Sequence, residues 1–245
     1  MSHHYIEARE LSYAYPDGTQ ALRDISFRIE HGEAVGIVGG NGAGKSTLLL
    51  HLNGLLLPAQ GNVVIGDIPV SASTRAQIHR TVGFIFQDSD DQLFMPTVFD
   101  DVTFGPLNMG LSADEARARA VSALESVDAT QLGPRAPYRL SGGETRAAAI
   151  AGVLAMAPSI LVLDEPSANL DPTARRRLIE LLRSFSHTRV IATHDLDLVL
   201  DVCTRVLVLH GGRLRADGAP CQIFHDGNLL VSCHLEVPLS WQRRS

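Results

Sequence analysis

The feature that most constrains this chain is a glycine-rich segment between two apolar runs, Gly39-Gly40-Asn41-Gly42-Ala43-Gly44-Lys45-Ser46-Thr47. It fits the pattern of a glycine, four arbitrary residues, then Gly-Lys and a serine or threonine. The run 34–38 before it predicts a strand, and the run 48–52 after it predicts a helix. In that order, backbone N–H groups, a helix N-terminus and a cation converge, which predicts a site for a phosphate chain.

The same segment supplies most of the candidate nucleotide-binding residues. Its glycines permit positive φ and let the backbone approach an anion closely. Lys45 would reach the β- and γ-phosphates, and the Ser46 hydroxyl would bind Mg²⁺. An ordinary Gly/Asn turn before a helix is the alternative, and the flanking strand and helix make it the weaker interpretation. The predicted contacts are Gly39, Asn41, Gly42, Ala43, Gly44, Lys45, Ser46 and Thr47.

Composition limits the class of protein. The chain has 245 residues, 45% hydrophobic and 20% charged, which suits one large domain or a domain with a smaller lobe. A net charge of −6 argues against a nucleic-acid binder with a basic surface. No apolar run reaches the ~20 residues that span a bilayer, and no signal peptide is evident. Three widely spaced cysteines indicate reduced thiols in a cytosolic protein, so membrane contact is expected only through partners.

Hydrophobic patterning predicts an α/β arrangement of strands and helices. Strands are expected at 5–15, 21–29, 61–65, 81–86, 160–163 and 189–193, and a hairpin over 206–216 turns at Gly211 and Gly212. Helices are expected at about 112–127, 145–157, 172–185 and 195–203, with Ser112, Asp171 and Asp195 as N-caps.

Two adjacent carboxylates mark a second candidate site. The apolar run 160–163 is typical of a strand buried on both faces, and Asp164 and Glu165 follow its carboxyl end. Open α/β sheets bind ligands at that end. A solvated strand end is the alternative, and it is less consistent with a phosphate loop elsewhere. Gln87 and His194 also follow predicted strands, where a lone polar residue is more often structural.

Two places allow two interpretations each. In Leu140-Ser141-Gly142-Gly143-Glu144, Ser141 and Glu144 fit a helix-capping pattern. Two glycines are poor in a first helical turn, however, and suit a backbone that contacts a phosphate. Tyr15, just before a Pro-Asp-Gly turn, is either a half-buried strand aromatic or a ring that stacks on adenine.

The predicted organisation is one domain with an inserted lobe. Residues 1–80 and 139–217 form the core, 81–138 a helix-rich lobe between two halves of one sheet, and 218–245 a tail. A metal site from His225, Cys233 and His234 matches no standard ligand spacing, and His3 and His4 are expected to be solvated.

Taken together, these motifs resemble the nucleotide-binding subunit of an ATP-binding-cassette (ABC) transporter over nearly all of 6–217. The resemblance implies a P-loop NTPase core with an N-terminal antiparallel β subdomain and an inserted helical subdomain. Tyr15 matches the adenine-stacking aromatic, Gln87 the glutamine of a metal- and partner-sensing loop, and His194 the switch histidine. The segment 140–144 matches the family signature, 160–165 the second nucleotide motif and 167–171 the dimer loop.

Within that family the chain resembles the energy-coupling-factor type, especially cobalt or nickel importer ATPases, through segments 86–94, 102–106 and 151–158. The alternative is an importer whose cargo is a vitamin such as biotin. Some motif positions depart from the family pattern without removing a charged or nucleophilic group, so activity is expected to survive. These departures are Gly40, Thr145, Ser167 and Asn169.

The resemblance implies ATP hydrolysis with Mg²⁺. Glu165 would orient the attacking water, and Lys45 and His194 would contact the γ-phosphate. Ser46 would bind Mg²⁺ directly and Asp164 through water, and Gln87 would complete the metal and water shell.

The resemblance also implies partners. Two subunits would pair head to tail, with Ser141, Gly142 and Gly143 of each closing the other's site; a homodimer is expected. A transmembrane scaffold and a substrate-binding membrane component would complete the assembly at the cytoplasmic face of the inner membrane. The acidic stretch 88–91, with Asp100 and Asp101, is either a solvated face or a groove for a basic coupling helix.

Two other functions remain open. A soluble cassette protein of translation or DNA maintenance would normally carry two cassettes or a coiled-coil insertion and a basic surface. A small-molecule kinase would leave the segment 140–144 and His194 without a role.

Overall fold

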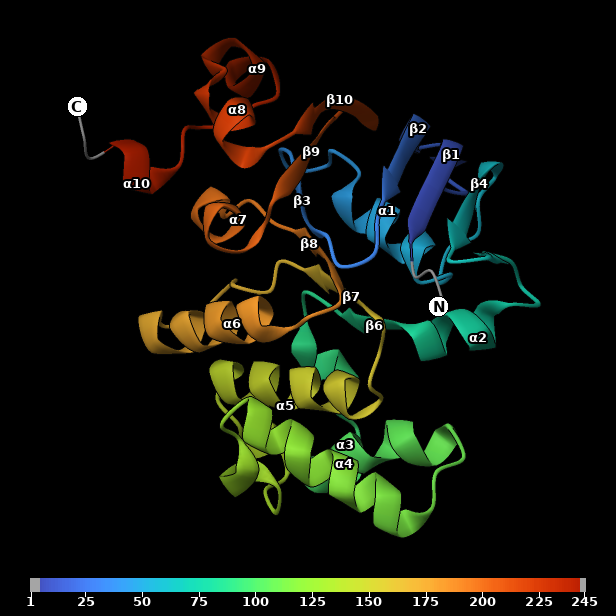
Figure 1. Cartoon of the computed structure of the whole chain (residues 1–245), viewed down its shortest axis with the longest axis vertical. Helices are drawn as coiled ribbons and strands as arrows, with labels where there is room; N and C mark the ends of the chain where they lie inside the picture. Colours follow the sequence, from blue (N-terminus) through green and yellow to red (C-terminus); the bar gives the residue numbers. More distant parts are fainter. Residues whose placement is uncertain (1–4, 243–245) are drawn as a thin grey trace.

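The computed structural model of this chain describes residues 5–242, so the expectation for His3 and His4 lies outside it. Figure 1 shows two sheets with helices between and beside them, and a helical lobe at the bottom of the view. Within residues 5–242, none of the helices combines the length and apolar character that crossing a membrane requires.

The central element is a six-stranded sheet in the order β10-β9-β3-β8-β7-β6. All neighbours in it pair in parallel except β10, which forms an antiparallel hairpin with β9. Because parallel strands end at the same edge, the residues that follow β3, β6, β7 and β8 meet there. The strands are β3 (Ala34–Val38), β6 (Val82–Ile85), β7 (Ile160–Asp164), β8 (Thr188–Ala192), β9 (Arg205–His210) and β10 (Arg213–Gly218).

A second, antiparallel sheet in the order β2-β1-β4-β5 forms the predicted N-terminal lobe. Helix α1 (Lys45–Leu52) lies against both sheets, and its buried leucines join one core with β1, β2 and one face of β3, β7 and β8. Alternation along the central strands divides them between cores: Ile160 and Val162 face this core, and Leu161 and Leu163 face the opposite one. The strands are β1 (Ile6–Ala14), β2 (Gln20–Ile29), β4 (Gln60–Ile65) and β5 (Ile68–Pro69).

Helices α6 and α7 cover the opposite face of the central sheet, together with the C-terminal residues. As predicted, Asp171 caps α6: its carboxylate accepts from the Thr173 and Ala174 amides at 2.8 and 2.9 Å, with Pro172 in the first position. The tail, left unassigned from sequence, forms short helices whose Phe224 and Leu230 are buried. The helices are α6 (Pro172–Ser184), α7 (Leu196–Val202), α8 (Pro220–His225), α9 (Gly227–Ser232) and α10 (Leu239–Gln242).

The helical lobe consists of α3 (Val98–Asn108), α4 (Ala113–Ser126) and α5 (Gly142–Ala155), packed around small buried side chains. Both α4 and α5 begin with the predicted reciprocal capping of serine and glutamate. Two helices were not predicted from the sequence: α3, which has Pro106 inside it, and α2 (Arg75–Thr81), in which Ile78 is the buried residue. Their weak periodicity gave no clear helical signal.

The predicted fold class is confirmed, but two elements lie elsewhere than the predicted subdomain division placed them. Strand β6 pairs in parallel with β7 inside the central sheet, so 82–85 are not part of the helical lobe. Helix α5 packs on α3 and α4 and therefore belongs to that lobe. The apolar run at 81–86 was recognised as a strand, but its distant partner β7 could not be read from periodicity.

Candidate nucleotide-binding site

The glycine loop joins β3 to α1, as predicted, and two of its glycines are required by its packing. A Cβ on Gly39 would lie 2.3 Å from the carbonyl oxygen of Leu209. Gly44 caps α1 with a φ of 103°, and a Cβ there would lie 2.6 Å from the carbonyl oxygen of Ala21. The loop is thus fixed by its neighbours in a form that only glycine adopts easily.

Lys45 places a buried cation beside this loop. Its Nζ donates to the carbonyl oxygens of Gly39 and Gly40 at 2.8 and 3.3 Å, and the residue is 8% exposed. Ser46, the next residue, is exposed. Among residues 5–242, the hydrogen bonds of this buried ammonium go to these two carbonyls. An incoming anion would supply a stronger, charged acceptor.

Asp164 ends β7 close to the lysine and Ser46. Burial raises the pKa of Asp164, while the Ser46 hydroxyl and the Lys45 charge act in the opposite direction. Its Oδ1 is buried and has no hydrogen-bond partner within residues 5–242. An unpartnered carboxylate oxygen beside a serine hydroxyl is the oxygen donor set that Mg²⁺ prefers, so the residues present fit that ion.

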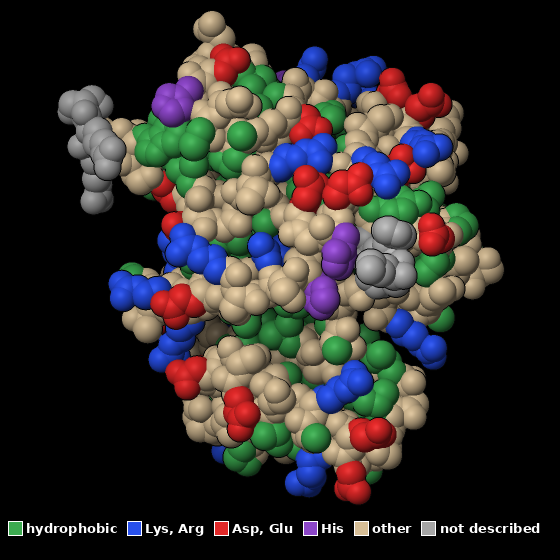
Figure 2. Space-filling view, viewed as in Figure 1, with side chains coloured by type: hydrophobic (Ala, Val, Ile, Leu, Met, Phe, Trp, Pro, Cys, Tyr) green, Lys and Arg blue, Asp and Glu red, His purple; other side chains and the backbone are tan. Residues whose placement is uncertain are grey.

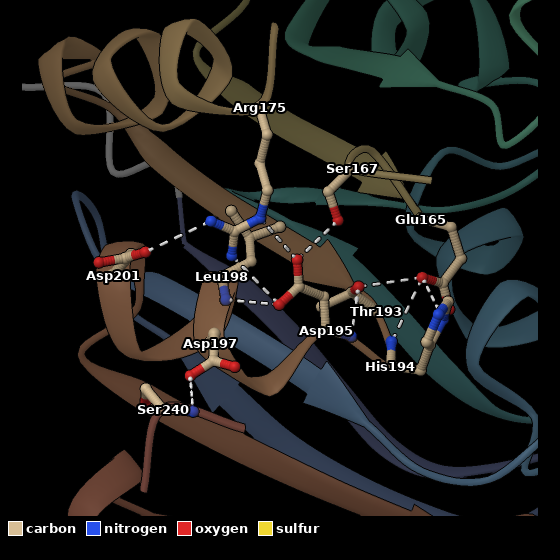
Figure 3. A network of polar contacts seen from close by, with 10 residues as sticks. All are labelled: Glu165, Ser167, Arg175, Thr193, His194, Asp195, Asp197, Leu198, Asp201 and Ser240. Atoms are coloured by element: carbon tan, nitrogen blue, oxygen red, sulfur yellow. Dashed lines mark hydrogen bonds and ion pairs between the residues drawn. The ribbon is translucent and has the colours of Figure 1, made fainter. Parts of the chain in front are cut away.

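Glu165 is held firmly next to Asp164. It has a φ of 45° and is 8% exposed, and its Oε2 accepts from Thr193 Oγ1 at 2.9 Å and from the His194 amide at 3.2 Å. The His194 Nδ1 lies 2.9 Å from the same oxygen, while the His194 side chain is 71% exposed. The structure therefore brings two predicted site residues, Glu165 and His194, into direct contact (Figure 3).

Behind this pair lies a polar network that the sequence analysis did not assign to the site. The Asp195 amide donates to Thr193 Oγ1 at 3.0 Å, and its carboxylate accepts from Ser167 Oγ and Arg175 Nε at 3.1 and 3.0 Å (Figure 3). Burial favours a higher pKa for Asp195, but the Arg175 hydrogen bond and the other contacts prevail and lower it. Asp195 was recognised only as a helix cap, because partners from α6 leave no local pattern in sequence.

Tyr15 follows β1 and is half-buried. Its hydroxyl lies 2.9 Å from Thr47 Oγ1, and its ring meets Tyr13 edge-on with centroids 5.2 Å apart. The structure thus brings Tyr15 to the first turn of α1, beside the phosphate loop.

Gln87 lies at the carboxyl end of β6 with an exposed side chain. Its backbone oxygen accepts from Arg146 Nη2 at 2.7 Å, and the Phe86 oxygen accepts from Nη1 at 3.1 Å. Gln92 holds the same segment, since its Oε1 accepts from the Phe86 amide at 3.0 Å. Arg146 comes from α5 and is 6% exposed, so it links the helical lobe to the Gln87 segment. Arg146 was not predicted as part of the site; an arginine directly before an uncharged, alanine-rich run was the available signal.

The Ser141 segment is a capped helix start, and its glycines have no packing reason in the described chain. The Glu144 amide meets Ser141 Oγ at 3.4 Å, and Glu144 Oε2 accepts from the Ser141 amide at 2.8 Å. A Cβ on Gly142 would meet nothing within 4 Å, and one on Gly143 would meet only Ala174 at 3.9 Å. The capping interpretation is therefore correct, but it leaves these glycines unexplained.

This segment lies apart from the phosphate loop. Figure 1 shows α5 in the helical lobe and α1 on the opposite side of the central sheet. One surface hollow includes Gly39, Asn41, Ser167, His194 and residues 234–240. A second hollow, between the helical lobe and α6, includes Ser141, Gly143, Asp171 and Arg177. One chain thus brings together Tyr15, the loop, Asp164, Glu165 and His194, but not Ser141, Gly142 and Gly143.

The three residues of the weak metal interpretation have other surroundings. The His225 ring lies 4.5 Å from that of Trp241, and the His234 ring lies 5.1 Å from that of His210. Cys233 is 1% exposed.

Comparison with known proteins identifies the family of this chain. The ABC transporter family model matches residues 22–168. A protein of Geobacter sulfurreducens, described as an ABC transporter ATP-binding protein, is 60% identical over 99% of this chain and 97% of its own length. An energy-coupling factor transporter ATP-binding protein, EcfA of Methanothermobacter thermautotrophicus, is 48% identical over 95% of this chain and 76% of its own length.

Solved structures agree. CbiO1 of Clostridium perfringens, described as part of the ABC transporter complex CbiONQ, has a TM-score of 0.82 and 38% identity over 94% of both chains. The dimeric bacterial ABC transporter cassette MJ0796 has a TM-score of 0.80 and 28% identity over 88% of this chain and 98% of its own. The chain therefore belongs to the ABC transporter family, as an ATP-binding subunit and an ATPase.

Proposed function

We propose that this chain is the ATP-hydrolysing motor of a membrane importer of the energy-coupling-factor type. The observation that carries the proposal is the position of Glu165, beside Asp164 and the phosphate loop, with its carboxylate held by Thr193 and His194. A carboxylate held in this way can accept a proton from, and so orient, a water at the end of a bound triphosphate. The similarity to EcfA and to CbiO1 supports the importer type.

We assign the remaining roles by position. Lys45 binds the β- and γ-phosphates, His194 contacts the γ-phosphate, and loop residues 39–47 donate their amides. Tyr15 stacks on adenine. Ser46, Asp164 and, through its exposed amide, Gln87 hold Mg²⁺, which when bound neutralises phosphate charge and aligns the terminal phosphate. This chain's own contribution is positioning and charge stabilisation, not a covalent intermediate.

Two copies are proposed to pair head to tail around ATP. Gly142 has open space in front of it, Gly143 has only Ala174 nearby, and both follow Ser141 at the positive end of a 14-residue helix. A second copy's nucleotide would fill that space and satisfy the first amides of α5. The dimeric MJ0796 cassette supports pairing, and a homodimer needs no second gene product.

A surface on the helical lobe is proposed to receive the transmembrane partner. Phe94 and Phe104 are 64% and 40% exposed, and their rings meet edge-on 5.0 Å apart. Exposed aromatic side chains beside acidic ones suit a basic amphipathic helix. One predicted member must be corrected: Asp101 is 8% exposed and accepts from the Phe94 and Met95 amides at 3.0 Å, so it shapes this surface from beneath. The acidic residues here are Asp88, Asp90, Asp91 and Asp100.

The proposed cargo is cobalt or nickel ion, delivered by a substrate-binding membrane component together with a scaffold protein; a vitamin of the biotin kind is the second candidate. The proposed location is the cytoplasmic face of the inner membrane, with contact through partners. No nucleic-acid partner is proposed, since basic and acidic side chains are interspersed on the face in Figure 2.

Uptake by cells tests this function. Cells that lack the chain, complemented with the wild type or with Glu165→Gln, would be supplied with radiolabelled Co²⁺, Ni²⁺ or biotin. Uptake of one of these that requires the wild type and fails with Glu165→Gln supports the importer. Membrane-independent co-purification with ribosomes, with uptake of all three unchanged, would instead support a soluble ABC ATPase.

Docking has its own test. Reversing charge with Asp91→Lys should reduce uptake while ATP hydrolysis by the isolated chain continues. Equal loss of both would exclude a coupling role for this surface.

A further inference from the structure

His51 is a fully buried polar ring that has no role in the site described above. It lies in the last turn of α1 among buried leucines (Leu48, Leu49 and Leu52) and is 0% exposed. Its Nε2 is buried and has no hydrogen-bond partner within residues 5–242. A leucine would fill this place without leaving a polar atom unpaired. A histidine here therefore indicates a contact that leucine cannot make.

That contact begins at the backbone of α1. The His51 Nδ1 lies 2.7 Å from the Thr47 carbonyl oxygen, and because a carbonyl oxygen only accepts, Nδ1 carries the proton. Burial lowers the pKa of His51, although its contact with the Thr47 backbone acts in the opposite direction, so the ring is neutral at pH 7. The hydrogen bond fixes the ring, which meets the ring of Tyr13 edge-on, with centroids 4.8 Å apart and planes at 74°.

Tyr13 in turn supports Tyr15. Side chains alternate along a strand, so these two tyrosines project to the same face at the end of β1. Their rings also meet edge-on, with planes at 86°. The Tyr15 hydroxyl lies 2.9 Å from Thr47 Oγ1. The contacts thus form a closed circuit: the Thr47 carbonyl holds His51, His51 meets Tyr13, Tyr13 meets Tyr15, and the Thr47 hydroxyl holds Tyr15.

This circuit restricts the Tyr15 ring from two sides. The backbone of Tyr15 is held as well, since its amide donates to the Thr19 oxygen and its oxygen accepts from the Gly18 amide, both at 2.9 Å. The helix that anchors the circuit also carries Lys45 at its first position, so one helix positions both the ring and the phosphate loop. A ring that is fixed before the ligand arrives loses less freedom when a base stacks on it.

We propose that His51 and Tyr13 are positioning residues that set the orientation of the Tyr15 ring and thereby the affinity for the adenine part of the nucleotide. This inference rests on the proposed role of Tyr15 in stacking on adenine. His51 is too deeply buried to touch a ligand. Its effect should therefore appear in the binding of the base and not in the binding of the phosphates.

The test compares a ligand that has a base with one that has none. Calorimetry would give the dissociation constants of ADP, which is not hydrolysed, and of tripolyphosphate, each with Mg²⁺. Tyr15→Ala should raise the dissociation constant of ADP roughly five- to hundredfold. His51→Leu should raise it about two- to tenfold, the value of an edge-on aromatic contact, and leave that of tripolyphosphate unchanged.

A double-mutant cycle shows whether the effect passes through Tyr15. In a Tyr15→Ala background, adding His51→Leu should change the binding of ADP no further. Tyr13→Leu removes the middle ring at a half-buried strand position and should reproduce the loss of ADP affinity, so it decides the question even if His51→Leu fails to fold. Leu52→Met alters the buried core beside His51 and serves as the matched control, with both dissociation constants unchanged.

The outcomes separate this inference from the role of Tyr15. Wild-type affinity for ADP in Tyr15→Ala would overturn the adenine contact and this inference with it. A loss in Tyr15→Ala, with wild-type affinity in Tyr13→Leu and His51→Leu, would overturn this inference alone. Equal weakening of ADP and tripolyphosphate, or a further loss in the Tyr15→Ala background, would also overturn it, since His51 would then support α1 in general.

Discussion

The Nδ1 of His194 lies 2.9 Å from the Oε2 of Glu165, and the same oxygen accepts from the Thr193 hydroxyl. The histidine is mostly exposed, whereas the carboxylate is buried. Glu165 is therefore fixed from the protein side by Thr193, while His194 remains able to turn toward a ligand. This pairing gives the site one rigid and one adaptable member.

Replacing Glu165 by glutamine should stop turnover and preserve the fold. The amide keeps the shape of the side chain but loses the charge that orients a water, so hydrolysis should fall at least 10²–10³-fold, on the order of the loss of one preorganised group. ATP should convert the variant to a stable dimer in size-exclusion chromatography. A monomeric peak in the presence of ATP and Mg²⁺ would contradict this prediction.

Thr193→Val should impair catalysis through the position of Glu165. The Thr193 hydroxyl donates to Glu165 Oε2 at 2.9 Å and accepts from the Asp195 amide at 3.0 Å. Valine matches the shape of threonine but can form neither hydrogen bond. We expect kcat to fall about tenfold with the KM for ATP unchanged, and stability to fall by about 1–3 kcal/mol. Thr193→Ser retains the hydroxyl and should recover most of kcat. A change confined to KM would argue against a positioning role.

Gly142→Ala should separate folding from dimer closure. A Cβ there meets nothing within 4 Å, so the variant should melt like the wild type or slightly higher. In the proposed head-to-tail dimer the same methyl group would face a phosphate, so hydrolysis and ATP-dependent dimerisation should both weaken about tenfold or more.

Gly227→Ala is the matched control for that variant. Gly227 is also the first residue of a helix with open space around it, in α9. It should hydrolyse ATP as the wild type does. Equal activity of both alanine variants would show that the space before Gly142 is not used.

Arg146→Ala should loosen the link between the helical lobe and the Gln87 segment. The guanidinium is buried and donates to the Phe86 and Gln87 carbonyl oxygens at 3.1 and 2.7 Å. Its removal leaves both acceptors unpaired, which should cost roughly 2–3 kcal/mol in urea unfolding. Lysine cannot bridge two carbonyls with a planar fork, so Arg146→Lys should recover less than half of the loss. Hydrogen exchange at 86–92 should accelerate in both variants.

Thiol chemistry should distinguish the cysteines by burial. Burial raises the pKa of Cys203 to about 12, whereas Cys221 is exposed. Iodoacetamide at pH 8 should label Cys221 in the native protein and Cys203 only after unfolding, since the thiolate is the reactive form. Early labelling of Cys203, mapped by mass spectrometry, would contradict its buried position.

The same thiol gives a pH dependence with a definite sign. Its folded-state pKa of about 12 lies above the reference value of 9.0, so the folded state retains the proton longer. The contribution of Cys203 to stability is complete below about pH 9 and is lost as the pH rises toward 12. Cys203→Ala should flatten the decline in melting temperature over that interval.

Much of the fold could be predicted because local chemistry dictated it. The glycine loop, the capping boxes at Ser112 and Ser141, and the buried run before Asp164 each carry a signal within a few residues. Asp164, Glu165 and His194 could be proposed as site residues for the same reason, since they lie at or just after the ends of strands that finish at one edge of the sheet.

The rest depends on contacts between distant segments. Arg146 reaches 60 residues back along the chain to the Phe86 oxygen, and Arg175 reaches 20 residues forward to Asp195. No periodicity records such pairs. The tail has no recognisable motif because its residues are buried by α7 and the central sheet. Asp101 was predicted to lie on the surface because its partners, the backbone amides of other residues, leave no mark in the sequence.

The position of β3 has a consequence for how the protein is made. The strand that carries the glycine loop begins at residue 34, but its neighbours β8 and β9 begin at residues 188 and 205. A nascent chain still on the ribosome therefore holds the loop long before it holds the strands that flank it. Polypeptides that end before β8 and β9 should therefore have no affinity for nucleotide. ATP binding by a nascent chain would show that synthesis has passed these two strands.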